Sequence, residues 1–472
     1  MFYYKKIKSE FNLVGGTLLL LFITNFILFA HIDIAIIGAG GFIISDGNIL
    51  NFYDEAVKNN LPQSYPISTF LIYGLWNKIG ILLDFIKNPG GPLTGHYSLW
   101  YKTLTLIFYI LSFFEIKNIF EKNKICKINS KNVALYVFSS PWIIFSVIIF
   151  SQVDILGIYF FVLGLKFLLK NKLIIGALII GFSFTFKPFL FLAFIAIIFS
   201  LQKNIFKIAQ VLFLGLAPYL VISLIYLNSQ GYITHVLGFG VLKKVLFPNI
   251  GGTKILILPF LYLIIFSYIY FFLKKKDFTV IFFYISLCYG LLFSLIDFYP
   301  QWLIYFGIFF SLTCIFLRFK TCILIFESFS FYLFLSYIVN NFRGNVDNML
   351  INWGPFNNKV TSEISINNFF IGKILTNEIN FSLFAASLIF LIFLAYYSVT
   401  GTYNKKKNFI KELNINDIVK LRFLVALTFF LLPASLCIAP LKMKLLFTFI
   451  TLICIIFILN KVYKKNFFLK ID

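Results

Sequence analysis

Runs of about 15–22 apolar residues recur along the whole chain, and this recurrence limits its fold more than any other feature. A helix of that length crosses a hydrocarbon core of about 30 Å. Sixty per cent of the residues are hydrophobic and 12% are charged, and the mean hydropathy is +0.92. Since lipid offers the backbone no hydrogen-bond partner, spanning segments must be helices. The sequence therefore predicts an all-α polytopic membrane protein.

We expect the first apolar run to be a retained span, because it lacks the small-residue cleavage site of a signal peptide. No separate soluble domain is evident. We divide the chain into a transmembrane core, 1–340, and a remainder, 341–472, that holds an outer loop and the C-terminal helices. The predicted spans number about 14 and cover approximately 13–31, 101–117, 133–150, 153–169, 173–187, 188–201, 208–227, 254–273, 278–296, 302–317, 321–340, 381–399, 421–440 and 445–460.

The charge pattern orients these spans. The net charge is +23, but the Lys and Arg residues form short clusters between apolar runs, which excludes nucleic-acid binding as its reason. With both termini in the cytoplasm, 28 of the 41 Lys and Arg residues lie inside and 13 outside. This bias follows the positive-inside rule. The Phe, Ile, Lys and Asn bias is typical of an AT-rich genome, so we expect a bacterial plasma membrane.

The segment from residue 33 to residue 100 is expected on the outer face. It carries five of the 18 acidic residues. We predict two helices in the outer interface, a short one over Gly47–Asn59 and a longer one over Ile67–Lys87. If the longer one spanned the membrane, every later loop would change sides and the positive-inside bias would invert.

Asp46 is the first candidate for chemistry, because an outer carboxylate beside a cavity can accept a proton from a sugar hydroxyl. The alternative is a plain N-cap of the short helix. Gln152 and Asp154 lie in a very short outer connection, where polar residues either line a cavity or simply face water. Lys187 lies at an outer junction and either holds a phosphate or reaches toward lipid headgroups.

Other polar residues give weaker indications. Gln301 follows Tyr299-Pro300 at an outer turn whose aromatic residues also suit a membrane interface. Arg343 and His96 are candidates for binding a phosphate or stabilising a leaving group. Glu327 lies inside a span, where it marks a functional cavity or pairs with nearby Arg318 or Lys320.

The six Cys residues show neither a CxxC nor a paired spacing, so we expect no metal site and no structural disulfide. The sequence contains no P-loop, GxGxxG or HExxH motif and no cytoplasmic nucleotide-sugar domain. The candidate residues lie on the expected outer face, where the cytoplasmic substrates ATP and nucleotide sugars are absent. A donor substrate available there must itself be carried by a lipid.

The chain resembles the GT-C superfamily of integral membrane glycosyltransferases, and within it the bacterial branch related to GPI mannosyltransferases. Relatives carry a similar glycine-bearing span that ends in Lys-Pro. The resemblance covers about the first 300 residues, along which the matching patches follow one another in order. Four patches carry it: the first outer loop with Asp46, Tyr53-Asp54-Glu55-Ala56 and Tyr65-Pro66; Pro141-Trp142 leading to Gln152-Val153-Asp154; Gly176 through Phe184 to Lys187-Pro188; and Tyr299-Pro300-Gln301-Trp302.

The resemblance implies an inverting transfer of a hexose, mannose-like or glucose-like, from a polyprenyl-phosphate sugar to a lipid-linked or cell-envelope glycan. The family's catalytic acid maps onto Asp46, with Asp54 or Asp33 as the alternative, although the usual paired acids are absent at Asp46. It implies no certain cofactor and leaves a divalent cation open. The residues that it implies for substrate binding are Asp33, Tyr65, Gln152, Asp154, Lys187, Gln301 and Arg343.

Two other classes of membrane protein compete with this interpretation. A lipid-linked oligosaccharide flippase would show related halves and charges deep in its spans, whereas these spans are nearly free of charge. A polysaccharide polymerase or ligase would gather Arg and His in a large late outer loop. The loop 340–380 has only Arg343 and no His, so this class ranks lower.

Overall fold

The apolar runs form helices throughout the part of the chain that the structure describes. The structure is a computed structural model, and the residues it describes are 2–87, 97–123, 128–238, 249–250, 253–254, 256–273, 278–296, 298–317, 319–341, 376–399, 413–437 and 448–460. Within these ranges five helices are long and apolar enough to cross a membrane, or up to seven if each of two bent pairs is one span. The molecule is thus a helical protein compatible with multiple membrane passes.

The longer helices are α1 (Phe2–Leu28), α2 (Ile32–Ser45), α4 (Ile67–Leu82), α5 (Ser98–Asn123), α8 (Asp154–Leu169), α9 (Leu173–Phe184), α10 (Phe191–Leu201), α11 (Ile205–Ile225), α14 (Ile257–Phe272), α15 (Phe278–Leu295), α16 (Leu303–Cys314), α17 (Lys320–Asn341), α19 (Asn377–Val399) and α20 (Ile415–Cys437). A last apolar helix covers Thr448–Asn460. The shorter elements are α3 (Phe52–Lys58), α6 (Ser130–Phe138), α7 (Pro141–Ile144), η2 (Phe145–Ile149), η3 (Pro188–Leu190), α12 (Gln230–Tyr232), η4 (Ile233–Leu237), η5 (Pro300–Trp302) and the strands β1 (Asn249–Ile250) and β2 (Thr253–Lys254).

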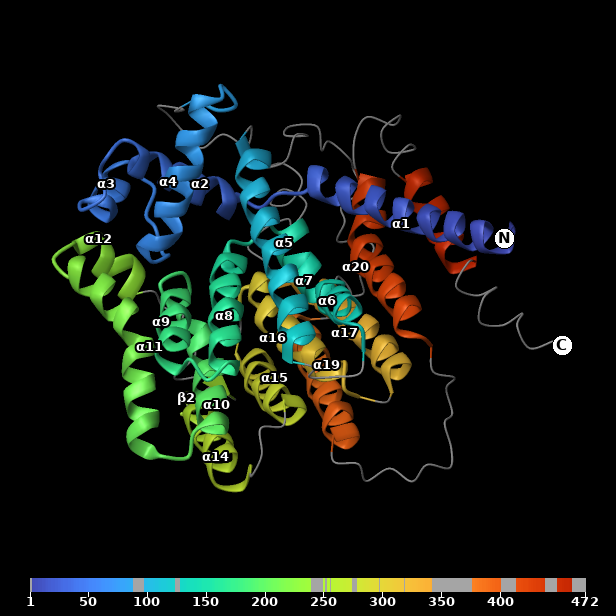
Figure 1. The fold of residues 1–472 in the computed structure, drawn as a ribbon. Coiled ribbons are helices and arrows are strands. Elements are labelled where there is room, and N and C mark those ends of the chain that lie inside the picture. The colour runs from blue at the N-terminus through green and yellow to red at the C-terminus, as the bar shows by residue number, and fades with distance from the viewer. Residues whose placement is uncertain are drawn as a thin grey trace.

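The segment after the first apolar run differs from the expected polar loop. Its first part is the apolar helix α2, which buries nine residues and bends away from α1 by 65°. The expected helix over Gly47–Asn59 shortens to α3, and Leu50 before it is 73% exposed instead of packed. In Figure 1, α2, α3 and α4 (blue) gather at one end of the molecule, with α12 beside α3.

A buried lysine fixes the bend between α1 and α2. Lys102, on α5, donates hydrogen bonds to the carbonyls of Phe26 and Phe29 and, over 3.0 Å, to the carbonyl of Ile148. The first two carbonyls lie at the C-terminal end of α1, where the helix has no further N–H groups to bond them. One side chain therefore satisfies the end of α1 and ties it to η2.

The expected span 133–150 is also bent. Pro141 follows Ser140 and starts a new helix at 59° to α6. The continuation is a π-turn, η2, in which each backbone N–H bonds five residues back. Such turns recur at functional sites because they shift the register of the following residues.

Small residues allow several helices to approach closely. A side chain on Gly181 of α9 would lie 2.1 Å from the carbonyl oxygen of Gly215 on α11. A side chain on Gly41 of α2 would lie 2.9 Å from the backbone of Tyr73 on α4. Close backbone contact through glycine is the usual way for helices to associate in lipid.

Candidate active site

The N-terminus of α2 presents the first polar group of the site. His31 is the N-cap, and its Nδ1 accepts a hydrogen bond of 3.1 Å from the backbone N–H of Asp33. The His31 ring stacks on Phe150 with centroids 3.9 Å apart, which holds the cap in place. The Asp33 carboxylate is 31% exposed and accepts a 3.3 Å hydrogen bond from Nε2 of Gln301.

The connection between η2 and α8 presents the second group. Ser151 adopts a left-handed φ of 68°, a conformation that costs energy in a residue other than glycine. The N–H of Gln152 then donates to the carbonyl of Ser146 at 2.8 Å. This tight turn directs Gln152 Nε2 to the hydroxyl of Tyr65, 2.8 Å away. Asp154 begins α8 with its side chain fully buried.

Lys187 joins these two groups. It lies in extended backbone immediately before η3, and its ammonium lies 3.9 Å from the ring centroid of Tyr65 and 5.4 Å from that of Trp302. Both rings face a cation favourably. Lys187 also interacts electrostatically with Asp154 and Asp33 without forming an ion pair with either.

Tyr65 is held in turn by its own backbone. The hydroxyl of Tyr53, on α3, donates to the Tyr65 carbonyl at 2.9 Å. Burial raises the pKa of Tyr65 well above its usual range, and the nearby carboxylates add to this. The phenol therefore stays neutral and contributes its ring to Lys187 and its hydroxyl to Gln152.

Several buried polar atoms in this group have no hydrogen-bond partner. They are both carboxylate oxygens of Asp154, the side-chain carbonyl oxygens of Gln152 and Gln301, and the hydroxyl of Tyr305. Tyr305 lies beside Asp154 without reaching hydrogen-bond geometry. We name the seven residues Asp33, Tyr65, Gln152, Asp154, Lys187, Gln301 and Tyr305 the polar cluster. An unpaired buried polar atom is costly and needs an explanation.

Six of the nine residues that the resemblance assigns to catalysis or substrate binding belong to the polar cluster. Asp46 does not, because it is exposed at the C-terminus of α2, about 20 Å from Asp33 along the helix axis at about 1.5 Å per residue. Asp46 therefore caps the end of α2 and does not begin the next helix. Arg343 and His96 lie outside the described residues.

Asp54 also lies apart from the polar cluster. Its carboxylate accepts hydrogen bonds of 2.9 Å from the Ser229 hydroxyl and from the N–H of Gly231. These bonds attach α12 to α3. The carboxylate is thus occupied by a packing contact between these two short helices.

Tyr305 is the member of the polar cluster that the sequence analysis missed. It follows Gln301 by four residues, which places both on one side of a helical turn. Tyr305 is a buried aromatic residue within an apolar run, and nothing else in its surroundings signals a role. The spacing from Gln301 was the available signal.

A second group of buried charges has a different character. Arg422 on α20 makes two hydrogen bonds to Glu327 on α17, of 2.7 and 2.9 Å, and one of 2.8 Å to Ser311 on α16. It also donates to the Tyr136 carbonyl and stacks on that ring at 4.1 Å. Arg422 is the partner that the sequence analysis did not identify for Glu327. Because the Arg422 guanidinium and the Glu327 carboxylate are paired with each other, this group joins α16, α17 and α20.

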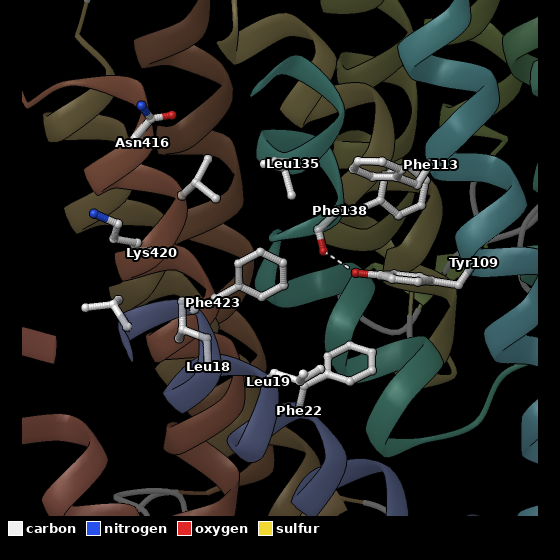
Figure 2. A pocket seen from close by; sticks show the side chains of 13 residues that line it. Leu18, Leu19, Phe22, Tyr109, Phe113, Leu135, Phe138, Asn416, Lys420 and Phe423 are labelled. Atoms are coloured by element: carbon white, nitrogen blue, oxygen red, sulfur yellow. Dashed lines mark hydrogen bonds between the residues drawn. The ribbon is translucent and has the colours of Figure 1, made fainter. Parts of the chain in front are cut away.

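An apolar crevice of about 380 Å³ lies between α1, α5, α6 and α20. Figure 2 shows Leu18, Phe22 and Phe113 on its walls, with the Tyr109 hydroxyl bonded to the Phe138 carbonyl. Lys420, also on its wall, pairs with Asp417 at 3.0 Å. None of the residues that line the crevice belongs to the polar cluster.

No protein-family model matches the chain, and no curated protein or solved structure is detectably similar to it. Among the described residues, no group of three or more His, Cys, Asp and Glu side chains is close enough to hold a metal ion.

Proposed function

We propose that the protein is an inverting glycosyltransferase that moves a hexose from a polyprenyl-phosphate sugar to a lipid-linked or cell-envelope glycan at the outer membrane face. The observation that carries this proposal is the polar cluster. One partly exposed carboxylate, a lysine and a set of unpaired acceptors lie together where several helices begin. Intramembrane ionisable residues without a structural pairing indicate a functional site.

Asp33 is the base that this geometry favours among the first-loop carboxylates. Gln301 and the His31 cap hold it in place while part of it stays accessible. In the proposed step, Asp33 takes the proton from the acceptor hydroxyl as that oxygen bonds to the anomeric carbon. The bond from that carbon to the phosphate oxygen breaks, and a single displacement inverts the configuration.

Lys187 is the proposed partner of the leaving phosphate. Its ammonium lies over two aromatic rings and within electrostatic range of two carboxylates. A phosphate that enters the polar cluster gains attraction from this charge as the leaving group becomes more negative. We further propose about 14 spans in a bacterial plasma membrane, with both termini cytoplasmic and the polar cluster at the outer face.

The decisive experiment mixes purified protein with short-chain polyprenyl-phosphate hexoses and candidate acceptor glycans. We expect release of free polyprenyl phosphate with at least one hexose. A flippase would instead carry labelled lipid-linked glycan across a proteoliposome membrane and release nothing. Transport without release would overturn the proposed transferase.

A further inference from the structure

The unpaired atoms of the polar cluster share one chemical property. Both Asp154 oxygens and the carbonyl oxygens of Gln152 and Gln301 are hydrogen-bond acceptors, and all are buried. Tyr305 adds a hydroxyl, which can accept or donate. Lys187 and Tyr305 carry N–H and O–H donors in the same polar cluster, yet these acceptors have no partner. A ligand that pairs with them must therefore bring N–H or O–H groups to several points of the polar cluster.

The orientation of Gln301 follows from its partner. The Asp33 carboxylate only accepts hydrogen bonds, so the NH₂ group of Gln301 must face Asp33 and its carbonyl oxygen must face away. The NH₂ group of Gln152 likewise faces the Tyr65 hydroxyl. Each amide uses one N–H within the protein and leaves its carbonyl oxygen without a partner.

The charge balance disfavours a metal ion as that ligand. Two carboxylates and one ammonium leave a net charge near −1, and the Lys187 ammonium interacts with both carboxylates. A divalent cation placed among these oxygens would have to lie close to that ammonium. A neutral ligand rich in O–H groups meets the demand for donors without this repulsion.

We propose that the buried acceptors of the polar cluster bind the free hydroxyl groups of the donor's sugar ring, so that the site takes an unsubstituted hexose and rejects deoxy sugars. This inference rests on the proposed transferase function and adds its substrate class. Asp33 is the partly exposed member of the polar cluster, so we place the entry of the sugar beside it. A missing hydroxyl leaves a buried acceptor unpaired, which is why such sites discriminate strongly.

The first test compares the preferred donor with its 2-, 3-, 4- and 6-deoxy analogues. We expect at least one analogue to lose about 100-fold or more in kcat/KM. Equal use of all analogues would overturn the inference while leaving the transferase standing. A divalent-cation requirement that disappears in Asp154→Asn would also overturn it, because the acceptors would then be metal ligands.

A matched pair of variants assigns the discrimination to one side chain. Gln152→Met removes the acceptor, and we expect the penalty for the matching deoxy analogue to fall below about 10-fold. Gln152→Glu keeps an acceptor at the same place and can take a hydrogen bond from Tyr65, so the penalty should persist. An unchanged penalty in Gln152→Met, with the corresponding Gln301→Met also unchanged, would contradict the inference.

A binding measurement separates failure of the inference from failure of the function. Thermal unfolding is followed with polyprenyl phosphate and with its hexose derivative. We expect the hexose derivative to raise the Tm more than polyprenyl phosphate alone does. In Gln152→Met the two ligands should raise the Tm equally. If the hexose adds to the rise in Tm but no donor is turned over, the sugar-binding site is supported and the transferase function is rejected. If the hexose adds nothing to the rise in Tm, the sugar-binding site is rejected.

Discussion

Three of the carboxylates that follow the first apolar run, those of Asp33, Asp46 and Asp54, differ in their surroundings and so in the roles open to them. Asp33 is held by Gln301 at the edge of the polar cluster. Asp54 is used to attach α12 to α3. Asp46 sits at the C-terminal end of α2, where the helix dipole disfavours a negative charge. Position in the sequence makes Asp46 the first candidate for the catalytic base, whereas the contacts favour Asp33.

We expect Asp33→Asn to lower kcat by about 10²–10⁴-fold, because the amide keeps the hydrogen bond but cannot accept a proton. Donor binding and Tm should stay close to those of the unmodified protein. Polyprenyl phosphate release measures the rate. Asp46→Asn and Asp54→Asn are the matched comparators, and normal turnover in Asp33→Asn with a loss in Asp46→Asn would return the base to Asp46.

Lys187→Met should raise the KM for the donor, because the phosphate loses its cationic partner while the methylene stem still packs on Tyr65. Steady-state kinetics with varied donor concentration measure this. Lys78, on α4, lies apart from the polar cluster, and Lys78→Met is the control. Unchanged donor kinetics in a well-folded Lys187→Met protein would make Lys187 a residue that only reaches toward headgroups.

The short motifs made most of the polar cluster predictable. Gln152, Asp154, Lys187 and Gln301 stood out because each is a polar residue at the end of an apolar run. What the sequence did not reveal is which first-loop acid faces them. That depends on the bend after α1, which a hydropathy pattern does not report.

At the scale of the helix, the departures from expectation are bends and close contacts. Residues 13–31 and 133–150 were expected as simple spans and the segment 33–100 as an outer polar stretch, whereas the structure forms two sharply bent pairs, α1–α2 and α6–α7. Lys102 stabilises one bend through backbone carbonyls, and Pro141 starts the other. Proline is visible in a sequence, but the partners of a buried lysine are not, because they come from distant helices.

Gly181→Ala should destabilise the protein by about 1–3 kcal/mol, the usual cost of overpacking. The new methyl group would meet the Gly215 carbonyl at 2.1 Å, so α9 and α11 would have to separate. Reversible unfolding in detergent measures the change. Gly16→Ala is the matched control, because nothing lies within 4 Å of its added carbon; equal effects at both sites would contradict the packing.

Glu327→Gln should cost about 3–5 kcal/mol of stability, because the Arg422 charge would be buried without its partner. The double replacement Glu327→Leu with Arg422→Met should cost less than the single one. Unfolding free energies of the three proteins test this. If the single variant is as stable as the parent, the buried pair does not hold α17 and α20 together.

At the scale of the whole molecule, the polar cluster lies on one side of the alternating helices. Asp154 begins α8, Lys187 precedes η3, and Gln301 lies in η5. The opposite ends of these helices lead into lysine-bearing connections such as Lys170–Lys172. The charge bias predicts that the ends bearing the polar cluster face outward, and the number of spans depends on short helices that composition alone does not resolve.

Cysteine labelling with an impermeant reagent tests this orientation in a background without the six native cysteines. We expect Asn48→Cys to be labelled in intact cells, and Asn171→Cys, Lys275→Cys and Lys406→Cys only after the membrane is opened. Asn48 lies just past α2, and Asn171 lies between α8 and α9. Labelling of Asn171→Cys but not of Asn48→Cys in intact cells would show that the orientation is the reverse of the proposed one, with the polar cluster on the cytoplasmic side.

The bond between Gln301 and Asp33 joins residues 268 positions apart, and this sets an order of events during synthesis. At about 5–20 residues per second, the ribosome needs roughly 13–54 s to deliver Gln301 after Asp33 has emerged. During that interval the Asp33 carboxylate lacks this partner. The polar cluster is therefore completed late in biogenesis, and nascent chains that stop before η5 are expected to lack it and to depend on membrane chaperones.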